Sequence, residues 1–255
     1  MKKIFFFVLI LFSACAKDKQ GSVSLIAPET FLNYIQSKIP QQPDAIISVF
    51  CDPVLKEFPK PKILVSAFLS SDLDNGDAIQ EVSFANLKLS KVLDKPNNKV
   101  SFSTYTDVIN PFNQKVAVNF KTTFFDFKGD FHLPELVKLD VGSKKFSKSK
   151  GYTINWNRGE DNDLPVQISF MYDEVATAFL NPKASLAKED LQITKFVKDD
   201  GNFTLTSTDL APFPLGSIVK VSIKRGSFSY QKSNDKNILI YSITTDTYPV
   251  LVVED

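Results

Sequence analysis

Apolar and polar residues alternate along most of the chain after residue 44, and this period of two predicts β-strands. Proline, asparagine and aspartate separate the alternating segments at positions that favour turns. In the first half the expected strands are 45–50, 63–69, 82–89, 100–105 and 116–121, with 124–131 as an edge strand or a loop that covers the core. In the second half they are 137–141, 152–157, 166–172, 191–193, 203–205, 218–223, 238–243 and 250–253. Short strands with one polar face are typical of antiparallel sheets.

One segment has the helical period instead. Its apolar residues share one face of a helix, and they are Phe31, Leu32, Ile35 and Ile39. Glu29 precedes the segment, where a negative charge favours a helix N-terminus, and Pro40 ends it. The sequence therefore predicts one short helix near the N-terminus.

These elements predict a mainly β protein with two β-sandwich-type domains. Residues 28–132 are expected to form a β-rich domain that contains the helix. Residues 133–255 are expected to form an Ig-like β-sandwich, because roughly seven short alternating strands in about 120 residues suit that fold. The segment 133–136, which contains Pro134, marks the expected boundary.

The first residues have the layout of a secretory signal. Lys2 and Lys3 precede the apolar run Ile4–Phe12, which is too short for the ~20 residues of a membrane-spanning helix. Ser13-Ala14-Cys15 follows and resembles a bacterial lipobox. The resemblance implies that residues 1–14 are a signal peptide, that Cys15 is lipidated, and that residues 15–27 form a tether. The alternative is an ordinary cleaved signal with an incidental cysteine.

The residues after Cys15 resemble the export tag of Bacteroidota surface lipoproteins, in which lysine and acidic residues follow the lipidated cysteine. Lys17 and Asp18 are the matching residues here. The resemblance implies an outer-membrane lipoprotein exposed on the cell surface, and a merely solvated tether is the alternative.

A second resemblance concerns the C-terminal half. The segments 146–157, 201–205 and 224–226 are similar to a β-sandwich module of Bacteroidota surface proteins, in which a strand containing tryptophan is followed by an Asp/Asn/Gly loop. This resemblance implies a fold and no particular activity.

Composition narrows the function classes. The net charge is +1, and only Arg158 and Arg225 supply guanidinium groups, so nothing favours a nucleic-acid partner. If Cys15 is acylated, Cys51 is the one remaining cysteine, and no intramolecular disulfide can form. An exported protein of this kind has to rely on its hydrophobic core, for which 23 phenylalanines are available.

Two acidic loops are candidate sites. Asp72, Asp74 and Asp77 alternate around a glycine and offer oxygen ligands to a structural calcium ion, although aspartate also simply favours turns. The second loop lies between two expected strands, at a rim of the sandwich where ligands commonly bind. Its candidate ligand-binding residues are Trp156, Arg158, Glu160, Asp161 and Asp163. The alternative is a solvated hairpin loop with Trp156 in the core.

The remaining reactive side chains do not form a catalytic set in the sequence. His132 is the only histidine, whereas histidine-based catalysis and metal sites need partners, so it is expected to be structural. Cys51 ends an apolar strand and is expected to be a small buried residue. The nine glycines form no phosphate-binding loop.

The sequence thus favours a lipid-anchored protein of the outer membrane that acts as a non-enzymatic binding or accessory module for a protein or a glycan. No catalytic residue and no cofactor other than the candidate calcium ion is expected. Two alternatives stay open. One is a glycan-directed hydrolase that uses carboxylates of the two acidic loops, and the other is a structural lipoprotein that faces the periplasm.

Overall fold

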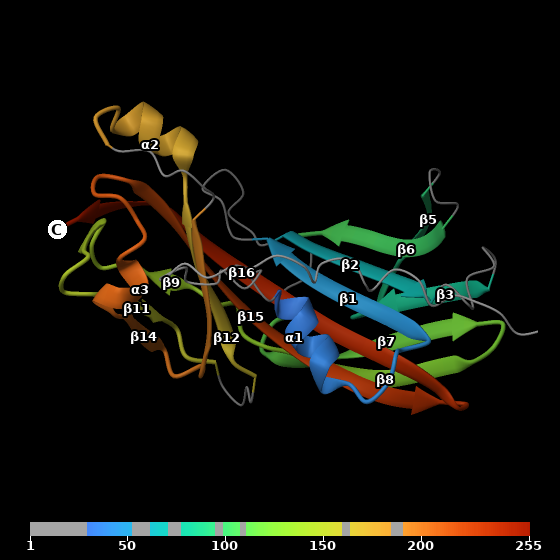
Figure 1. Ribbon diagram of the computed structural model, residues 1–255. Coiled ribbons are helices and arrows are strands. Elements are labelled where there is room, and N and C mark those ends of the chain that lie inside the picture. The colour runs from blue at the N-terminus through green and yellow to red at the C-terminus, as the bar shows by residue number, and fades with distance from the viewer. Residues whose placement is uncertain are drawn as a thin grey trace, which may run out of the picture.

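A long hairpin runs from one end of the molecule to the other (Figure 1). The computed structural model describes residues 30–52, 62–70, 78–94, 99–107, 111–159, 164–184 and 191–255. The hairpin consists of β15 (Ile218–Ser233) and β16 (Lys236–Glu254). Asn234 and Asp235 join the strands with φ angles of 47° and 61°, the left-handed turn that matches the twist of a β-hairpin.

The hairpin is the centre of a nine-stranded sheet that contains strands from both halves of the chain. On one side of it lie β12 (Val166–Tyr172) and β13 (Gln192–Val197). On the other side the order is β1 (Ala45–Asp52), β2 (Lys62–Leu69), β6 (Lys99–Thr106) and β5 (Ser90–Asp94). β10 (Lys145–Ser147) pairs with the end of β16. β1 and β16 are parallel, with Ala45 opposite Ile238 and Cys51 opposite Thr244.

A second sheet closes the core of the N-terminal half. Its order is β4 (Leu87–Lys88), β3 (Ile79–Phe84), β7 (Gln114–Thr122) and β8 (Asp126–Leu133). Buried side chains alternate along β7, as the period of two predicts. Phe84, Phe120 and Phe127 from this sheet pack against buried aliphatic residues of β1, β2 and β16. The segment 124–131, whose role the sequence left open, contributes β8.

The C-terminal half contains two sheets packed face to face, which agrees with the predicted mainly β, sandwich-type fold. A three-stranded sheet of β14 (Asn202–Leu205), β11 (Tyr152–Trp156) and β9 (Leu139–Asp140) faces the part of the large sheet made by β13, β12, β15 and β16. The chain passes between the sheets after β9, β10, β11, β13 and β14, so that each sheet contains pairs that are not neighbours in sequence, such as β11 with β14 and β12 with β15. Tyr152, Ile154 and Trp156 point inward from β11.

Three helices are present in the described part of the chain, and none is long and apolar enough to cross a membrane. α1 (Phe31–Lys38) is the predicted helix, begun by the Thr30 side chain, which accepts a hydrogen bond from Asn33 N at 3.1 Å. It lies on the outer face of the large sheet and buries Phe31 and Ile35 there. The sequence did not predict α2 (Glu174–Leu180), between β12 and β13, or α3 (Ser207–Leu210), between β14 and β15. Both are too short for a clear helical period.

The hairpin belongs to both halves. Residues 238–244 of β16 pair with β1, whereas residues 219–224 of β15 pair with β12. Arg225 and Thr244 face each other at the point where the first set of pairings ends and the second begins. The core of the N-terminal half therefore contains residues of β16, which the sequence-based division at residues 132 and 133 assigns to the other domain.

Candidate functional site: a buried ion pair and a polar recess

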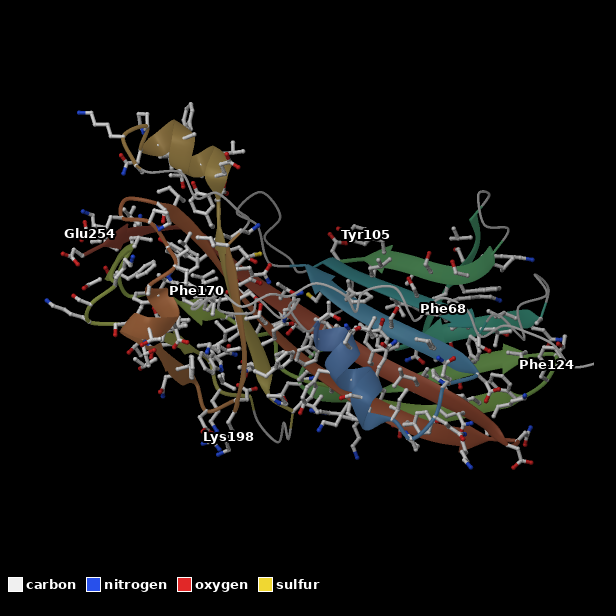
Figure 2. All side chains as sticks on the ribbon, in the orientation of Figure 1. Phe68, Tyr105, Phe124, Phe170, Lys198 and Glu254 are labelled. Carbon is white, nitrogen blue, oxygen red and sulfur yellow. The ribbon has the colours of Figure 1, made fainter. Side chains whose placement is uncertain are left out.

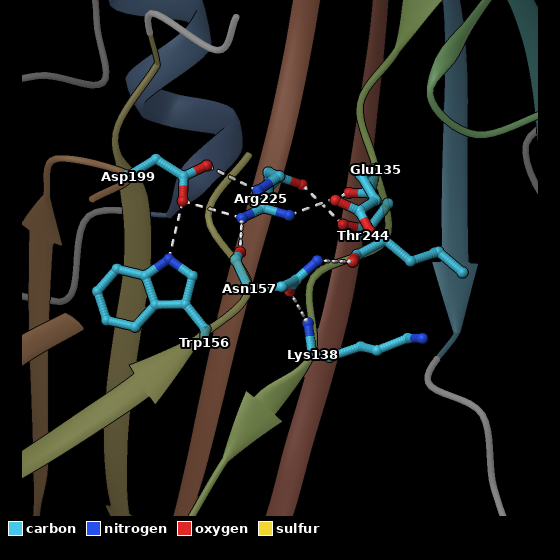
Figure 3. A network of polar contacts seen from close by, with 8 residues as sticks. Glu135, Lys138, Trp156, Asn157, Asp199, Arg225 and Thr244 are labelled. Carbon is cyan, nitrogen blue, oxygen red and sulfur yellow. Dashed lines mark hydrogen bonds and ion pairs between the residues drawn. The ribbon is translucent and has the colours of Figure 1, made fainter. Parts of the chain in front are cut away.

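A buried ion pair lies where the hairpin passes from one half to the other (Figure 3). Arg225 Nε donates to Asp199 Oδ2 at 2.7 Å, and Arg225 Nη2 donates to Asp199 Oδ1 at 2.9 Å. The two side chains are 0% and 2% exposed. Because guanidinium and carboxylate meet through two parallel hydrogen bonds, the orientation of both side chains is fixed.

The other polar atoms of the pair are bonded to the C-terminal sandwich and to the segment that follows β8. Arg225 Nη1 donates to Glu135 O at 3.2 Å, and Nη2 also donates to Asn157 O. Trp156 Nε1 donates to Asp199 Oδ1 at 2.8 Å. Glu135 lies just after β8 of the N-terminal half, whereas Trp156 ends β11 of the C-terminal sandwich. The pair therefore connects the C-terminal sandwich to the segment that leaves β8.

Asn157 extends this network along the segment that links the halves. Its Oδ1 accepts a hydrogen bond from Lys138 N at 2.6 Å, and its Nδ2 donates to Leu136 O at 2.9 Å. Gly159 lies directly against the ion pair, since a Cβ at this position would be 2.7 Å from Asp199 Oδ2. The arrangement leaves no room for a ligand at the pair, and its role is structural.

The structure places the two described residues of the predicted binding loop apart. Trp156 is 5% exposed and belongs to the hydrophobic core, with its indole nitrogen bonded to Asp199. Arg158 is exposed at the surface. The other members of that loop, and the leader and calcium candidates, lie outside the described residues: Glu160, Asp161, Asp163, Cys15, Lys17, Asp18, Asp72, Asp74 and Asp77.

Cys51 and His132 belong to no cluster of metal-binding side chains among the described residues. Cys51 is 4% exposed within β1. His132 is half-buried in β8, and its backbone oxygen accepts a hydrogen bond from Ser227 Oγ at 2.9 Å. Backbone pairing does not link β8 and β15. The hydrogen bond from the Ser227 side chain joins them instead.

A polar recess of about 230 Å³ lies on the outer face of the C-terminal sheet. Its walls come from β12, β13, β15 and β16 and from the residue that begins α1. The lining residues are Thr30, Gln167, Ser169, Met171, Gln192, Lys220, Ser222, Lys224 and Thr247. Most of them stand in cross-strand rows, with Gln167 opposite Lys224, Ser169 opposite Ser222, and Met171 opposite Lys220.

The recess offers hydrogen-bond donors and positive charge. Lys220 and Lys224 carry ammonium groups, and the described lining contains no carboxylate that would neutralise them. Ser169 Oγ and Thr194 Oγ1 are 3.2 Å apart and share a hydrogen bond, and Thr194 Oγ1 accepts a hydrogen bond from Gln192 Nε2 at 2.9 Å. Thr30 adds the N-terminus of α1, where the helix dipole favours negative charge. The surface is therefore suited to a polar ligand that carries an acidic group.

Sequence reasoning missed both features. Asp199 stands in a short polar turn. Apart from Thr30, the recess residues point away from the core on four strands, of which β12 and β15 are paired in the sheet but far apart in sequence. Within the described residues, no cluster of three or more histidine, cysteine, aspartate or glutamate side chains could hold a metal ion. Comparisons with models of known protein families and with curated protein sequences give no match to this chain.

Proposed function

We propose that the protein is a lipid-anchored binding module of the outer membrane, without catalytic activity of its own. It is exposed on the cell surface and binds a glycan through the recess on the outer face of its Ig-like sandwich. The lipobox-like sequence that ends at Cys15 and the charged residues Lys17 and Asp18 support the anchor and the export.

The recess is the observation on which the binding function rests. Its rows of hydroxyl and amide groups match the hydroxyls of a sugar, and its two ammonium groups match a carboxylate or sulfate substituent. The strands beneath it are held by the packed core and by the ion pair, so the groups are in place before a ligand arrives. An acidic glycan is therefore the ligand class that these side chains fit best.

Replacing both Lys220 and Lys224 with alanine is expected to weaken binding of an acidic glycan by roughly tenfold or more, because two charge-assisted hydrogen bonds are lost. The measurement is calorimetric titration of the protein with uronic-acid and sulfated oligosaccharides found by an array screen. Binding by the unchanged protein is also expected to weaken as salt is raised.

Lys232→Ala is the matched control, since this exposed lysine lies on the same strand but outside the recess. It should bind as tightly as the unchanged protein. If the double variant binds as tightly as Lys232→Ala, or if only neutral glycans bind, the assignment of an acidic glycan to the recess is wrong.

The anchor and the export signal are tested in cells. Cys15→Ser is expected to abolish incorporation of labelled palmitate and to release the protein from the membrane fraction, because the acyl chains are lost. Lys17→Ala/Asp18→Ala is expected to keep the label but to protect the protein from protease added to intact cells. Labelling that persists in Cys15→Ser, or equal protease cleavage with and without the tag, would contradict this part of the proposal.

A further inference from the structure

α2 presents apolar side chains to solvent. Val175 and Phe179 are four residues apart on one face of the helix and are 81% and 83% exposed, and Leu180 is 56% exposed. Thr177 is the buried residue of the helix, and its Oγ1 accepts a hydrogen bond from Ile218 N at 2.8 Å. Figure 2 shows the helix standing away from the sandwich, with side chains that point outward.

A neighbouring loop continues the apolar surface. Asn181 Nδ2 donates to Gly216 O at 3.0 Å, which places Leu215, 51% exposed, beside the C-terminal end of α2. The helix is fixed in this position, because the Asp173 side chain caps its N-terminus. We call Val175, Phe179, Leu180 and Leu215 the apolar tip. The tip is a firmly held surface that no described part of the chain covers.

The route of the chain indicates what covers the tip. Thr30 and Met171 both line the recess, and Asp173, the cap of α2, lies two residues after Met171. The N-terminus of α1 and the strand that leads into α2 thus border the same recess. Fourteen residues separate Cys15 from Thr30, and such a segment spans at most about 50 Å. A lipid surface that holds Cys15 is therefore within reach of the apolar tip.

The chemistry of the tip also fits a lipid surface better than a protein. A phenylalanine with three aliphatic side chains suits shallow insertion at the boundary between headgroups and acyl chains. The exposed Lys183 follows the helix, where its ammonium group can meet a lipid phosphate. A stable protein interface uses about 20–30 residues on each side, many more than this small helix and loop offer.

We propose that the apolar tip inserts into the membrane that holds the acylated Cys15 and so fixes the orientation of the sandwich above the lipid surface. The proposal rests on the anchor of the proposed function. A second contact of this kind adds to the acyl chains and keeps the protein from rotating freely on its tether.

The test uses the chain from Ala16 onward, which lacks Cys15 and its acyl groups but keeps every described residue. Its partition onto vesicles of phosphatidylethanolamine and phosphatidylglycerol is measured by sedimentation. Phe179→Ser is expected to weaken this partition by roughly tenfold, because the variant lacks the free energy gained when the phenylalanine side chain moves from water into lipid. In Phe179→Trp, the new indole is expected to shift its emission to shorter wavelength on vesicles and to be quenched by brominated acyl chains.

Phe124 provides the matched control, because it is a 44% exposed aromatic residue at the opposite end of the molecule (Figure 2). Phe124→Ser should partition like the unchanged protein, and Phe124→Trp should show no shift. Absence of vesicle binding, or equal binding by Phe179→Ser, overturns the proposal. If the unchanged protein binds a protein partner but no vesicles, and Phe179→Ser loses that partner, the tip is assigned to the partner and the proposal is likewise overturned. Since the tested chain is not acylated, these outcomes are independent of whether Cys15 is lipidated.

Discussion

Replacing Asp199 with alanine is expected to lower the free energy of unfolding by about 3–5 kcal/mol, because the Arg225 guanidinium stays buried without its partner. The loss also removes the acceptor for the Trp156 indole and loosens the connection to Glu135. Urea unfolding followed by the fluorescence of Trp156, the only tryptophan, measures the change. The emission of the folded variant should also differ, since the indole loses its hydrogen bond.

The next residue in the chain is the matched control for this variant. Asp200 forms an ion pair with Lys198 at 3.0 Å, but the two side chains are 48% and 83% exposed. Asp200→Ala should therefore change the free energy of unfolding by no more than about 0.5 kcal/mol. Arg225→Met combined with Asp199→Leu should be more stable than Asp199→Ala, because no buried charge is left alone. If Asp199→Ala and Asp200→Ala lower the free energy of unfolding equally, the buried pair stabilises the protein no more than the exposed one.

The period of two predicted the strands because each strand has one buried face, and the apolar positions in its own sequence identify that face. β7 is an example, in which every second residue from Val116 to Thr122 is buried. The partners of each strand are not recorded in the same way. β1 pairs in parallel with β16, although Ala45 and Ile238 are far apart in the chain. For this reason the sequence-based domain boundary was placed without the pairing of β1 with β16, which joins the two halves in one sheet.

The buried ion pair left a signal in the sequence that could have been used. Val219, Val221, Ile223 and Arg225 have the same parity in β15, so the alternation places the guanidinium on the buried face. Arginine is also rare in this chain, where nearly every other basic residue is lysine, and arginine is the cation best suited to buried pairs. The partner could not be found this way, because Asp199 stands in a polar turn that reads like a solvated loop.

The recess was beyond prediction for a geometric reason. Each of its strands shows only that Gln167, Ser169, Lys220 or Lys224 points away from the core. A site exists only once β12 and β15 are known to be neighbours, with Ser169 opposite Ser222. The position of α1 beside the recess could not be predicted either. The amphipathic pattern of the helix indicates that it packs on a sheet, but it does not indicate on which strands.

Gly226→Ala is expected to destabilise the protein by about 3 kcal/mol and to displace α1 from the sheet. An added Cβ would lie 2.5 Å from Phe31 Cε1 and 2.5 Å from Ser242 O. The first contact pushes against the helix and the second against the backbone of β16, and neither can be relieved by rotating a flexible side chain. Urea unfolding measures the stability, and cleavage by trypsin after Lys38 reports release of the helix.

Gly142→Ala is the control, because no atom lies within 4 Å of the Cβ that it adds. This variant should unfold and resist trypsin like the unchanged protein. Phe31→Ala in the Gly226→Ala background separates the two clashes, because it removes the ring but leaves Ser242 O in place. The double variant should stay less stable than Phe31→Ala alone. Equal stability of these two would mean that Gly226 is required only to seat the helix, and not for the close approach of β15 and β16.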